Sequence, residues 1–558
     1  MAPSNPSRLD TNSHAWRAAK IAKLGTRMGG FRAVYASAIG YYGPASSSTV
    51  DQYVGNEDPA DIEYLVAITS AFLHLLGARN MVPGSDFAAR TWRSLVNDGV
   101  VELYLDIVQS QGFLAEDARL VYMILLALDR IVKASKDSSG VADLLLSKMR
   151  NVWKSFWDTR HMLRPRSFAE HEPQLAGYEE AMINMLRGYW TLYHDRYKRC
   201  PPADTYIPHM ALFLWMRGNA LLDSTDNAFA ALNALLGFSV VDSGVSSGHD
   251  GSVGFVQEAI IDEFGLEAFC RRVDFDISQQ RHPEDLCAKD YLVWNNLVGV
   301  MITPQVLPYL LAHGTLGSLI SLRAALASMP GRGEEASFVW SAAYIIFRHA
   351  FSEHWRAHIE REDAVSVCHI PGEYLIDIIA SGLHDAVSHG YGYPEELFGE
   401  SLCEDMAIIA RFFNDVRKNP KRFKPEARAL FEQCRSSAPT QWYAALHAVQ
   451  VAGYRGFMDQ DLCRLITNGW TVFGQALGLR PDKERARLQR LKRVHCAWTL
   501  CAHHCTEPDV QLKACQGCGD VRYCSRACQK SDWKGHKGQC GNRLKPGPTG
   551  AENGVARV

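Results

Sequence analysis

Apolar residues recur at intervals of three and four along most of the chain up to Leu491, and strand-like alternation is scarce. In the segment 119–132, Leu120, Ile124, Leu128 and Ile131 fall on one stripe of a helix with 3.6 residues per turn. The same period predicts helices over 62–76, 178–193, 210–222, 338–351, 374–387, 404–416 and 444–451. The pattern therefore predicts a mostly α-helical fold in which each helix buries one face.

A glycine precedes several of these apolar stretches, at Gly99, Gly140, Gly265 and Gly314. Glycine permits a tight turn between two helices, since it adopts backbone conformations that other residues avoid. Helices repeated in this way resemble an armadillo or HEAT unit, in which neighbouring repeats stack because none can bury its apolar face alone. The spacing of the glycines is irregular, so the alternative is an irregular helical array.

Shifts in composition predict the boundaries of the parts. Residues 37–58 and 242–254 are rich in Gly and Ser, which indicates flexible loops, and the last residues have almost no apolar content. We predict an N-terminal helix and flexible loop over 1–58, a helical region over 59–241, a mobile linker over 242–254, a second helical region over 255–495, a cysteine-rich module over 496–541 and a disordered tail over 542–558.

The composition limits which cellular compartment and which kinds of partner are to be expected. The chain has 558 residues and a net charge of −2, so its overall charge gives no reason to expect binding to nucleic acid or acidic membranes. Eight of the 15 cysteines are scattered singly, as reduced thiols are, which favours an intracellular protein of the cytoplasm or nucleus. Residues 1–16 carry no apolar core of a secretory signal. The uncharged stretch 291–322 contains several polar side chains and predicts buried helices rather than a membrane span.

The other seven cysteines fall within 40 residues and form a pattern with one histidine. The eight potential ligands are Cys501, Cys505, Cys515, Cys518, Cys524, Cys528, His536 and Cys540. Zinc in structural sites takes four such ligands in a tetrahedron, so eight ligands predict two zinc ions. A site closed by four protein ligands leaves no position for a reactive water. The pattern therefore predicts structural zinc rather than hydrolytic zinc.

The stretch from Tyr523 to Cys540 reads YCSRACQKSDWKGHKGQC and resembles the second half of a MYND-type zinc finger, as does the upstream pair Cys515 and Cys518. The resemblance covers about residues 501–540 and implies interleaved sites. Carried over, Cys501, Cys505, Cys524 and Cys528 hold one zinc, and Cys515, Cys518, His536 and Cys540 hold the other. The first pair departs from the family because three residues separate its cysteines where two are usual. One of its ligands could therefore be replaced by a neighbour, among them His495, Cys496, His503 and His504.

Gln529 and Trp533 are four residues apart on a helix expected to begin near Ser525, so they share a face. In the MYND family the matching Gln and Trp line a groove for proline-rich peptides, and an aromatic plane suits the rigid polyproline conformation. The alternative is that Trp533 packs over the zinc core and Gln529 caps a backbone group.

Three further patterns carry less information. The basic segment 480–493 is interpreted as a solvated helix leading into the finger, with a nucleic-acid patch as the alternative. The GxSxG sequence at 244–248 lacks the strand-to-helix setting that a hydrolase needs. His354 and His358 have helical spacing for a metal pair, but Trp355 stands where a zinc protease has its glutamate.

Together these patterns predict a non-enzymatic adaptor with protein partners and no membrane association. Its finger docks a short, proline-rich peptide, and its helical body binds a second protein. The competing class is a SET–MYND lysine methyltransferase, although the cofactor motifs of a SET domain are not found in the sequence. A regulator that binds nucleic acid through residues 480–493 is the third option.

Overall fold

The protein is described here by a computed structural model, and the described residues are 66, 69–70, 72–73, 86–110, 112–116, 118–163, 173–217, 254–278, 297–329, 331–351, 370–388, 395–498, 500–504 and 506–540. The chain divides into two compact units, Met1–Ala357 and His358–Val558, called unit 1 and unit 2. Each is described by itself. The predicted linker 242–254 lies almost wholly outside the described residues, so that domain boundary stays a prediction.

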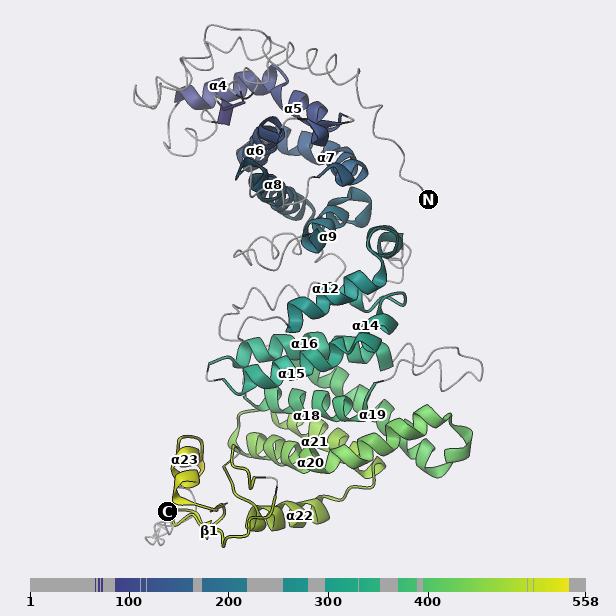
Figure 1. Ribbon diagram of the computed structural model, residues 1–558, viewed down its shortest axis with the longest axis vertical. Coiled ribbons are helices and arrows are strands. Elements are labelled where there is room, and N and C mark those ends of the chain that lie inside the picture. The colour runs from purple at the N-terminus through teal and green to yellow at the C-terminus, as the bar shows by residue number, and fades with distance from the viewer. Residues whose placement is uncertain are drawn as a thin grey trace, which may run out of the picture. The chain divides into compact units, whose positions relative to one another are not determined.

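Unit 1 is helical throughout its described residues (Figure 1). Its α-helices are α4 (Asp86–Asn97), α5 (Val100–Val108), α6 (Ala118–Ala134), α7 (Ser139–Thr159), α8 (Pro173–Tyr197), α9 (Ile207–Arg217), α12 (Leu266–Ser278), α14 (Leu307–His313), α15 (Thr315–Ala327) and α16 (Gly333–His349). Short 3-10 turns are η2 (Phe113–Ala115), η3 (Ser135–Asp137), η4 (Arg160–Met162) and η6 (Ala203–Thr205), and η9 (Gln257–Asp262) is a π-helix.

The helices of unit 1 pack on neighbours and next-neighbours: α6 on α8, α5 on α7, α7 on α9, and α15 on α16. The predicted stripe of α6 is confirmed, because Leu120, Ile124, Leu128 and Ile131 are all buried. Burying each such side chain stabilises the fold by about 1.5–3 kcal/mol. An armadillo arrangement remains a prediction, whereas the mostly α-helical fold is confirmed.

Glycines form three of the four predicted turns. Gly99, Gly265 and Gly314 have φ values of 76°, 79° and 83°, a left-handed conformation that favours glycine, and each stands directly before a helix. Gly140 differs, since it lies inside the first turn of α7. Among the described helices, none is by itself long and apolar enough to cross a membrane; α14 and α15 meet that criterion only as a pair, which is bent by 61°.

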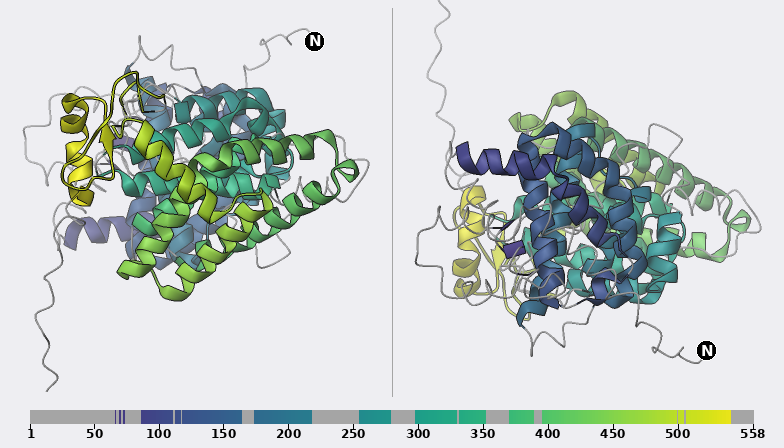
Figure 2. Two further views of the ribbon diagram at one scale, coloured as in Figure 1. Left: turned by 90° about the horizontal axis from the view of Figure 1, so that it is seen from below. Right: turned by 90° about the horizontal axis from the view of Figure 1, so that it is seen from above.

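Unit 2 contains a helical part and the cysteine-rich module. Its described elements are α18 (Gly372–Ser388), α19 (Glu395–Lys418), η11 (Pro420–Arg422), α20 (Pro425–Arg455), α21 (Gln460–Ala476), α22 (Pro481–Val494), β1 (Lys513–Ala514), β2 (Arg522–Tyr523) and α23 (Arg526–Cys540). The long α20 packs on α18 and α21, and α22 packs on α20. Figures 1 and 2 show α23, in yellow, beside the two short strands.

Two tryptophans lock α20 to α21. Trp442 Nε1 donates to the carbonyl of Trp470 and Trp470 Nε1 donates to the carbonyl of Trp442, each at 2.9 Å. Both indoles are fully buried. Gly474 allows this contact, because a Cβ there would lie 2.1 Å from the Trp442 ring. Helix α22, which leads into the finger, packs on α20, and α20 is itself held tightly against α21.

Most predicted helices lie inside observed ones, including 178–193 in α8 and 404–416 in α19. The segment 480–493 is helix α22, as predicted. The predictions for residues 1–58, for the GxSxG sequence 244–248, for the pair His354 and His358 and for the tail 542–558 lie outside the described residues.

Candidate metal centres

A two-stranded hairpin and one helix position the cysteines of the module. β1 and β2 pair antiparallel, with Lys513 opposite Tyr523 and Ala514 opposite Arg522. Cys515 follows β1 at the turn end of the hairpin, where its N–H donates to the Val521 carbonyl at 2.8 Å, and Cys524 follows β2 at the opposite end, so the hairpin places one cysteine in each of two groups. Helix α23 supplies the ligands farther along the chain.

Helix α23 begins as predicted. The Cys528 N–H donates to Ser525 Oγ at 3.1 Å, so Ser525 caps the helix. Cys528 stands in the first turn, and His536 and Cys540 lie four residues apart on the same face two and three turns later. One helix therefore contributes ligands to two separate groups.

Four cysteines form the first group: Cys496, Cys501, Cys524 and Cys528, whose sulfur atoms all lie within 4.8 Å of one another. The Sγ–Sγ distances are 3.5 Å from Cys501 to Cys524, 3.4 Å from Cys524 to Cys528 and 3.7 Å from Cys528 to Cys501. Thiolates around a tetrahedral zinc with bonds of about 2.3 Å are separated by about 3.8 Å. The group therefore fits one zinc ion.

Cys496 is the member of this group that the spacing did not select as a ligand, although it was among the possible replacements. The predicted ligand Cys505 lies outside the described residues. Cys496 is 1% exposed, and its backbone is fixed because its N–H donates to the His503 carbonyl and its carbonyl lies 2.9 Å from His504 Nδ1. The sequence did contain a signal for this ligand, because Cys496 is a ninth candidate and stands five residues before Cys501.

Cys515, Cys518, His536 and Cys540 form the second group, as the resemblance implied. Cys515 Sγ lies 3.5 Å from Cys540 Sγ, and Cys518 Sγ lies 3.5 Å from His536 Nε2. Bonds of about 2.3 Å to sulfur and 2.0 Å to nitrogen place tetrahedral ligands about 3.5–3.8 Å apart. The two groups alternate along the chain, so the interleaved arrangement is confirmed, and together they fit two zinc ions.

Glycine at position 517 is required by the second group. A Cβ on Gly517 would lie 2.4 Å from Cys540 Sγ and 3.7 Å from Cys515 Sγ. No φ in the left-handed region is involved, so the constraint is space alone. The turn between Cys515 and Cys518 can close around a metal only with hydrogen in that place.

Backbone N–H groups prepare one thiol for metal binding. Burial acts to raise the pKa of Cys515, but hydrogen bonds from the N–H groups of Cys518 and Gly517, together with those of His536 and Cys540, lower the pKa to about 6. The pKa of Cys524 is raised to about 12, first by burial and then by hydrogen bonds with Cys501 and Cys528. Thiols packed this closely resist ionising together, so a divalent cation is the natural counterpart of the cluster.

The predicted peptide-binding pair divides into two roles. Gln529 Nε2 lies 3.8 Å from Cys515 Sγ, as an amide donating to a ligand sulfur does. Trp533 is 42% exposed, and its ring meets His536 edge-on at 6.0 Å between centroids. Tyr523 supports the helix from the hairpin, because its hydroxyl donates to Asp532 Oδ2 at 2.7 Å. Gln529 thus serves the second metal group, and Trp533 presents an aromatic surface.

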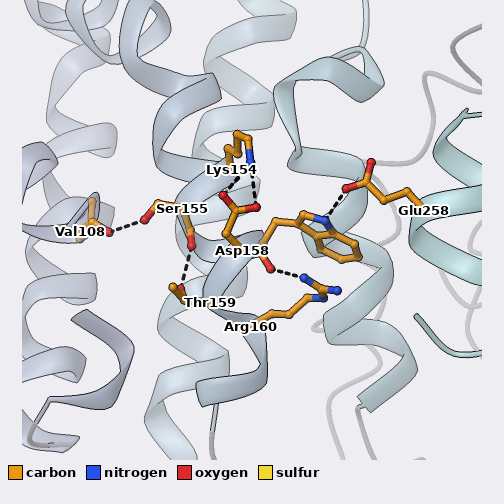
Figure 3. Close-up of polar contacts among 8 residues, drawn as sticks. Val108, Lys154, Ser155, Asp158, Thr159, Arg160 and Glu258 are labelled. Carbon is orange, nitrogen blue, oxygen red and sulfur yellow. Dashed lines mark hydrogen bonds and ion pairs between the residues drawn. The ribbon is translucent and has the colours of Figure 1, made fainter. Parts of the chain in front are cut away.

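Unit 1 holds a polar cavity of about 560 Å³ beside the C-terminal end of α7, lined by Lys154, Ser155, Asp158 and Thr159 among others. Figure 3 shows that its side chains bind one another: Lys154 Nζ lies 2.6 Å from Asp158, and Ser155 Oγ donates to the Val108 carbonyl. The Ser155 contact joins α7 to α5, and the Lys154–Asp158 pair lies within α7, so both support the packing of the helices.

Beside it, Trp157 Nε1 donates to Glu258 Oε1 at 2.6 Å, which ties α7 to the π-helix η9 (Figure 3). His209 lies under Trp157 and is 4% exposed. Burial, helped by the charge of Arg160, lowers the pKa of His209 to about 4. The imidazole is therefore neutral at pH 7 and acts as part of the core.

Comparison with known proteins supports the identity of the module. Residues 501–540 match the family model of the MYND finger. The "SET domain and MYND-type zinc finger protein 6" of Schizosaccharomyces pombe is 47% identical over 36 residues, which are 6% of this chain and 8% of that protein. No solved structure matches the chain. The C-terminal module is thus a MYND finger with two Cys/His groups that fit zinc.

Proposed function

We propose that the protein is a non-enzymatic adaptor whose MYND finger docks a short, proline-rich peptide and whose helical body binds a second protein. MYND fingers are in general protein-interaction modules. The proposed setting is the interior of the cell, where cysteine thiols stay reduced and available to zinc.

The observation that carries the proposal is the exposure of Trp533. An exposed indole offers a partner a large apolar area that binding can bury. Here the ring is 42% exposed and is held from below by His536, a member of the second metal group. A flat, supported aromatic surface suits a proline ring, and a polyproline helix loses little entropy on binding.

Gln529 contributes to peptide docking indirectly, through its hydrogen bond to the second metal group. Its amide donates to Cys515, so it fixes the start of α23 relative to the second group and thereby sets the direction in which Trp533 projects. The carbonyl end of the same amide can accept a hydrogen bond from a peptide N–H. A peptide that crosses α23 at this level meets an aromatic plane and an amide one helical turn apart.

The test uses the full chain with two pools of fluorescent dodecamer peptides, one proline-rich and one with each proline replaced by alanine. Fluorescence anisotropy is expected to show binding of the proline-rich pool alone. Substitution Trp533→Ala is expected to weaken that binding by at least tenfold, because aromatic residues at the centre of an interface contribute about 2 kcal/mol or more. Equal binding of both pools would refute the proposed specificity.

A methyltransferase is the competing function, favoured by the words "SET domain" in the name of the yeast relative. The matching stretch is 8% of that relative. Among the described residues the only strands, β1 and β2, lie within the finger, and the body before it is helical. Isothermal titration with S-adenosylmethionine separates the two functions. The adaptor proposal predicts no heat of binding, and micromolar binding would replace it with the enzyme.

A further inference from the structure

Two basic segments of unit 2, far apart in the sequence, each place one end at the same helix end. The first is the turn between α19 and α20, residues 417–428, and the second is helix α22. Arg417 Nη1 donates to the carbonyl of Gln475 at the end of α21, at 3.1 Å. Arg480, directly before α22, follows the turn that closes α21, in which Leu479 N donates to the Gly474 carbonyl at 2.8 Å. Arg417 and Arg480 therefore flank the same turn.

The α19–α20 turn concentrates positive charge. Residues 417–428 read RKNPKRFKPEAR, with six lysines and arginines against one glutamate, in a chain whose net charge is −2. Helix α22 is similar, since the segment 480–493 holds seven basic residues and two acidic ones. The sequence alone presented 480–493 as an ordinary solvated helix. Its position beside a second basic segment changes that interpretation.

The charges of the turn are exposed and uncompensated. Lys418, Lys421, Arg422 and Arg428 are exposed, Lys424 is half-buried, and none of the five forms an ion pair within the described part of the chain. By contrast, Arg487 of α22 is engaged with Glu484 and with the Pro439 carbonyl, which anchors that helix to α20.

The backbone of the turn is held in place. Asn419 N donates to the Asp415 carbonyl at 2.9 Å, Arg422 N donates to the Asn419 carbonyl at 3.0 Å, and two prolines restrict the chain at Pro420 and Pro425. Figure 1 shows the hairpin of α19 and α20 with α22 beneath α20. Because the backbone is already ordered, only the side chains lose freedom when the turn meets a ligand, so the turn is suited to bind an extended anion.

Two observations favour duplex nucleic acid over other polyanions. No exposed large apolar side chain lies within 417–428, so the surface has no anchor to insert into a membrane or to seat a peptide. Phe423, its one aromatic residue, packs edge-on against Phe412 at 5.8 Å, so no ring is offered for stacking unpaired bases. Charge without apolar anchors is typical of contact with the phosphates of a duplex.

We propose that the α19–α20 turn and the exposed face of α22 form one basic surface that binds the phosphate backbone of double-stranded nucleic acid without reading its sequence. The surface lies in unit 2 outside the metal groups, so it is a binding activity separate from the peptide docking proposed above. The partner peptide and the duplex would be held by the same unit.

The test is fluorescence anisotropy of the full-length protein with a labelled random-sequence DNA duplex, as a function of salt. A test variant carries Lys418→Gln, Lys421→Gln, Arg422→Gln and Lys424→Gln. A matched control removes the same charge from exposed positions of unit 1: Lys136→Gln, Lys148→Gln, Arg150→Gln and Arg187→Gln. Circular dichroism and zinc content establish that both variants fold.

Four phosphate contacts contribute a slope of about −3.6 in log K against log salt, so their share of the affinity falls about 150-fold between 50 and 200 mM salt. The test variant is expected to lose this part of the slope and to bind at least tenfold more weakly at 50 mM, whereas the control keeps the full slope. Absence of duplex binding at 50 mM, equal binding by test and control variants, or tighter binding to single strands or to anionic vesicles would each overturn the proposal.

Discussion

Replacing Gly517 with alanine is expected to release one of the two zinc ions while the other stays bound. The added Cβ would lie 2.4 Å from Cys540 Sγ, whereas non-bonded carbon and sulfur atoms need roughly 3.7 Å, so the sulfur must move by about 1.3 Å. Zinc sites tolerate about 0.2 Å in each bond. A free thiol could rotate away at little cost, but a ligand sulfur that rotates away leaves the metal.

The matched control is Gly535→Ala in helix α23. A Cβ there meets nothing within 4 Å, so the substitution adds only helix propensity, worth about 0.5–1 kcal/mol in favour of the fold. The assay is zinc per chain by atomic emission, followed by competition with a coloured chelator. We expect two zinc ions in the wild type and in Gly535→Ala.

For Gly517→Ala we expect one tightly bound zinc and a second whose affinity is lowered by at least 100-fold, since the displaced sulfur is a ligand itself. The zinc that stays bound is expected to be the one in the group that contains Cys501, Cys524 and Cys528. Two zinc ions of unchanged affinity in Gly517→Ala would refute the geometry of the second group. Loss of both ions would show that the two groups fold as one.

Three further predictions follow from other contacts. Cys496→Ser is expected to lower zinc to one ion per chain, whereas Cys505→Ser keeps two; the reverse result would assign the ligand to Cys505. Gly474→Ala is expected to destabilise unit 2 by about 1–3 kcal/mol, because its Cβ would overlap the Trp442 ring, and urea unfolding monitored by tryptophan fluorescence would measure it. Neutral, buried His209 has its pKa lowered from 6.5 to about 4, so it contributes stability that is present above pH 6.5 and is lost as the pH falls towards 4. That loss amounts to about 3 kcal/mol and should be absent in His209→Leu; an identical pH dependence in this variant would contradict the assignment.

The sequence predicted the metal module closely because zinc ligands obey strict local spacing. Seven of the eight predicted ligands lie in the two groups, and the start of α23 at Ser525 could be inferred from its capping residue. Cys496 was left open because the choice between it and Cys505 depends on hydrogen bonds to His503 and His504, which spacing does not encode.

The helices were predictable, but the contacts between them were not. Periodicity identified the buried stripe of α6, since 3.6-residue spacing is a property of one helix. The pairing of Trp442 with Trp470, the π-helix η9 and the meeting of residue 417 with residue 475 arise from tertiary packing. The proposed basic surface could therefore not be predicted from the sequence, in which its two parts are separate basic segments.

The most direct test of the central claim measures zinc content and peptide affinity on the same samples of wild type, Trp533→Ala and a control, Val510→Ala, which removes another exposed apolar side chain of the finger. We expect two zinc ions in all three proteins, with affinity for the proline-rich pool lowered at least tenfold in Trp533→Ala alone. If Trp533→Ala loses zinc, the ring is a structural part of the metal core. If it keeps both zinc and peptide affinity, the docking surface lies elsewhere and the account is contradicted.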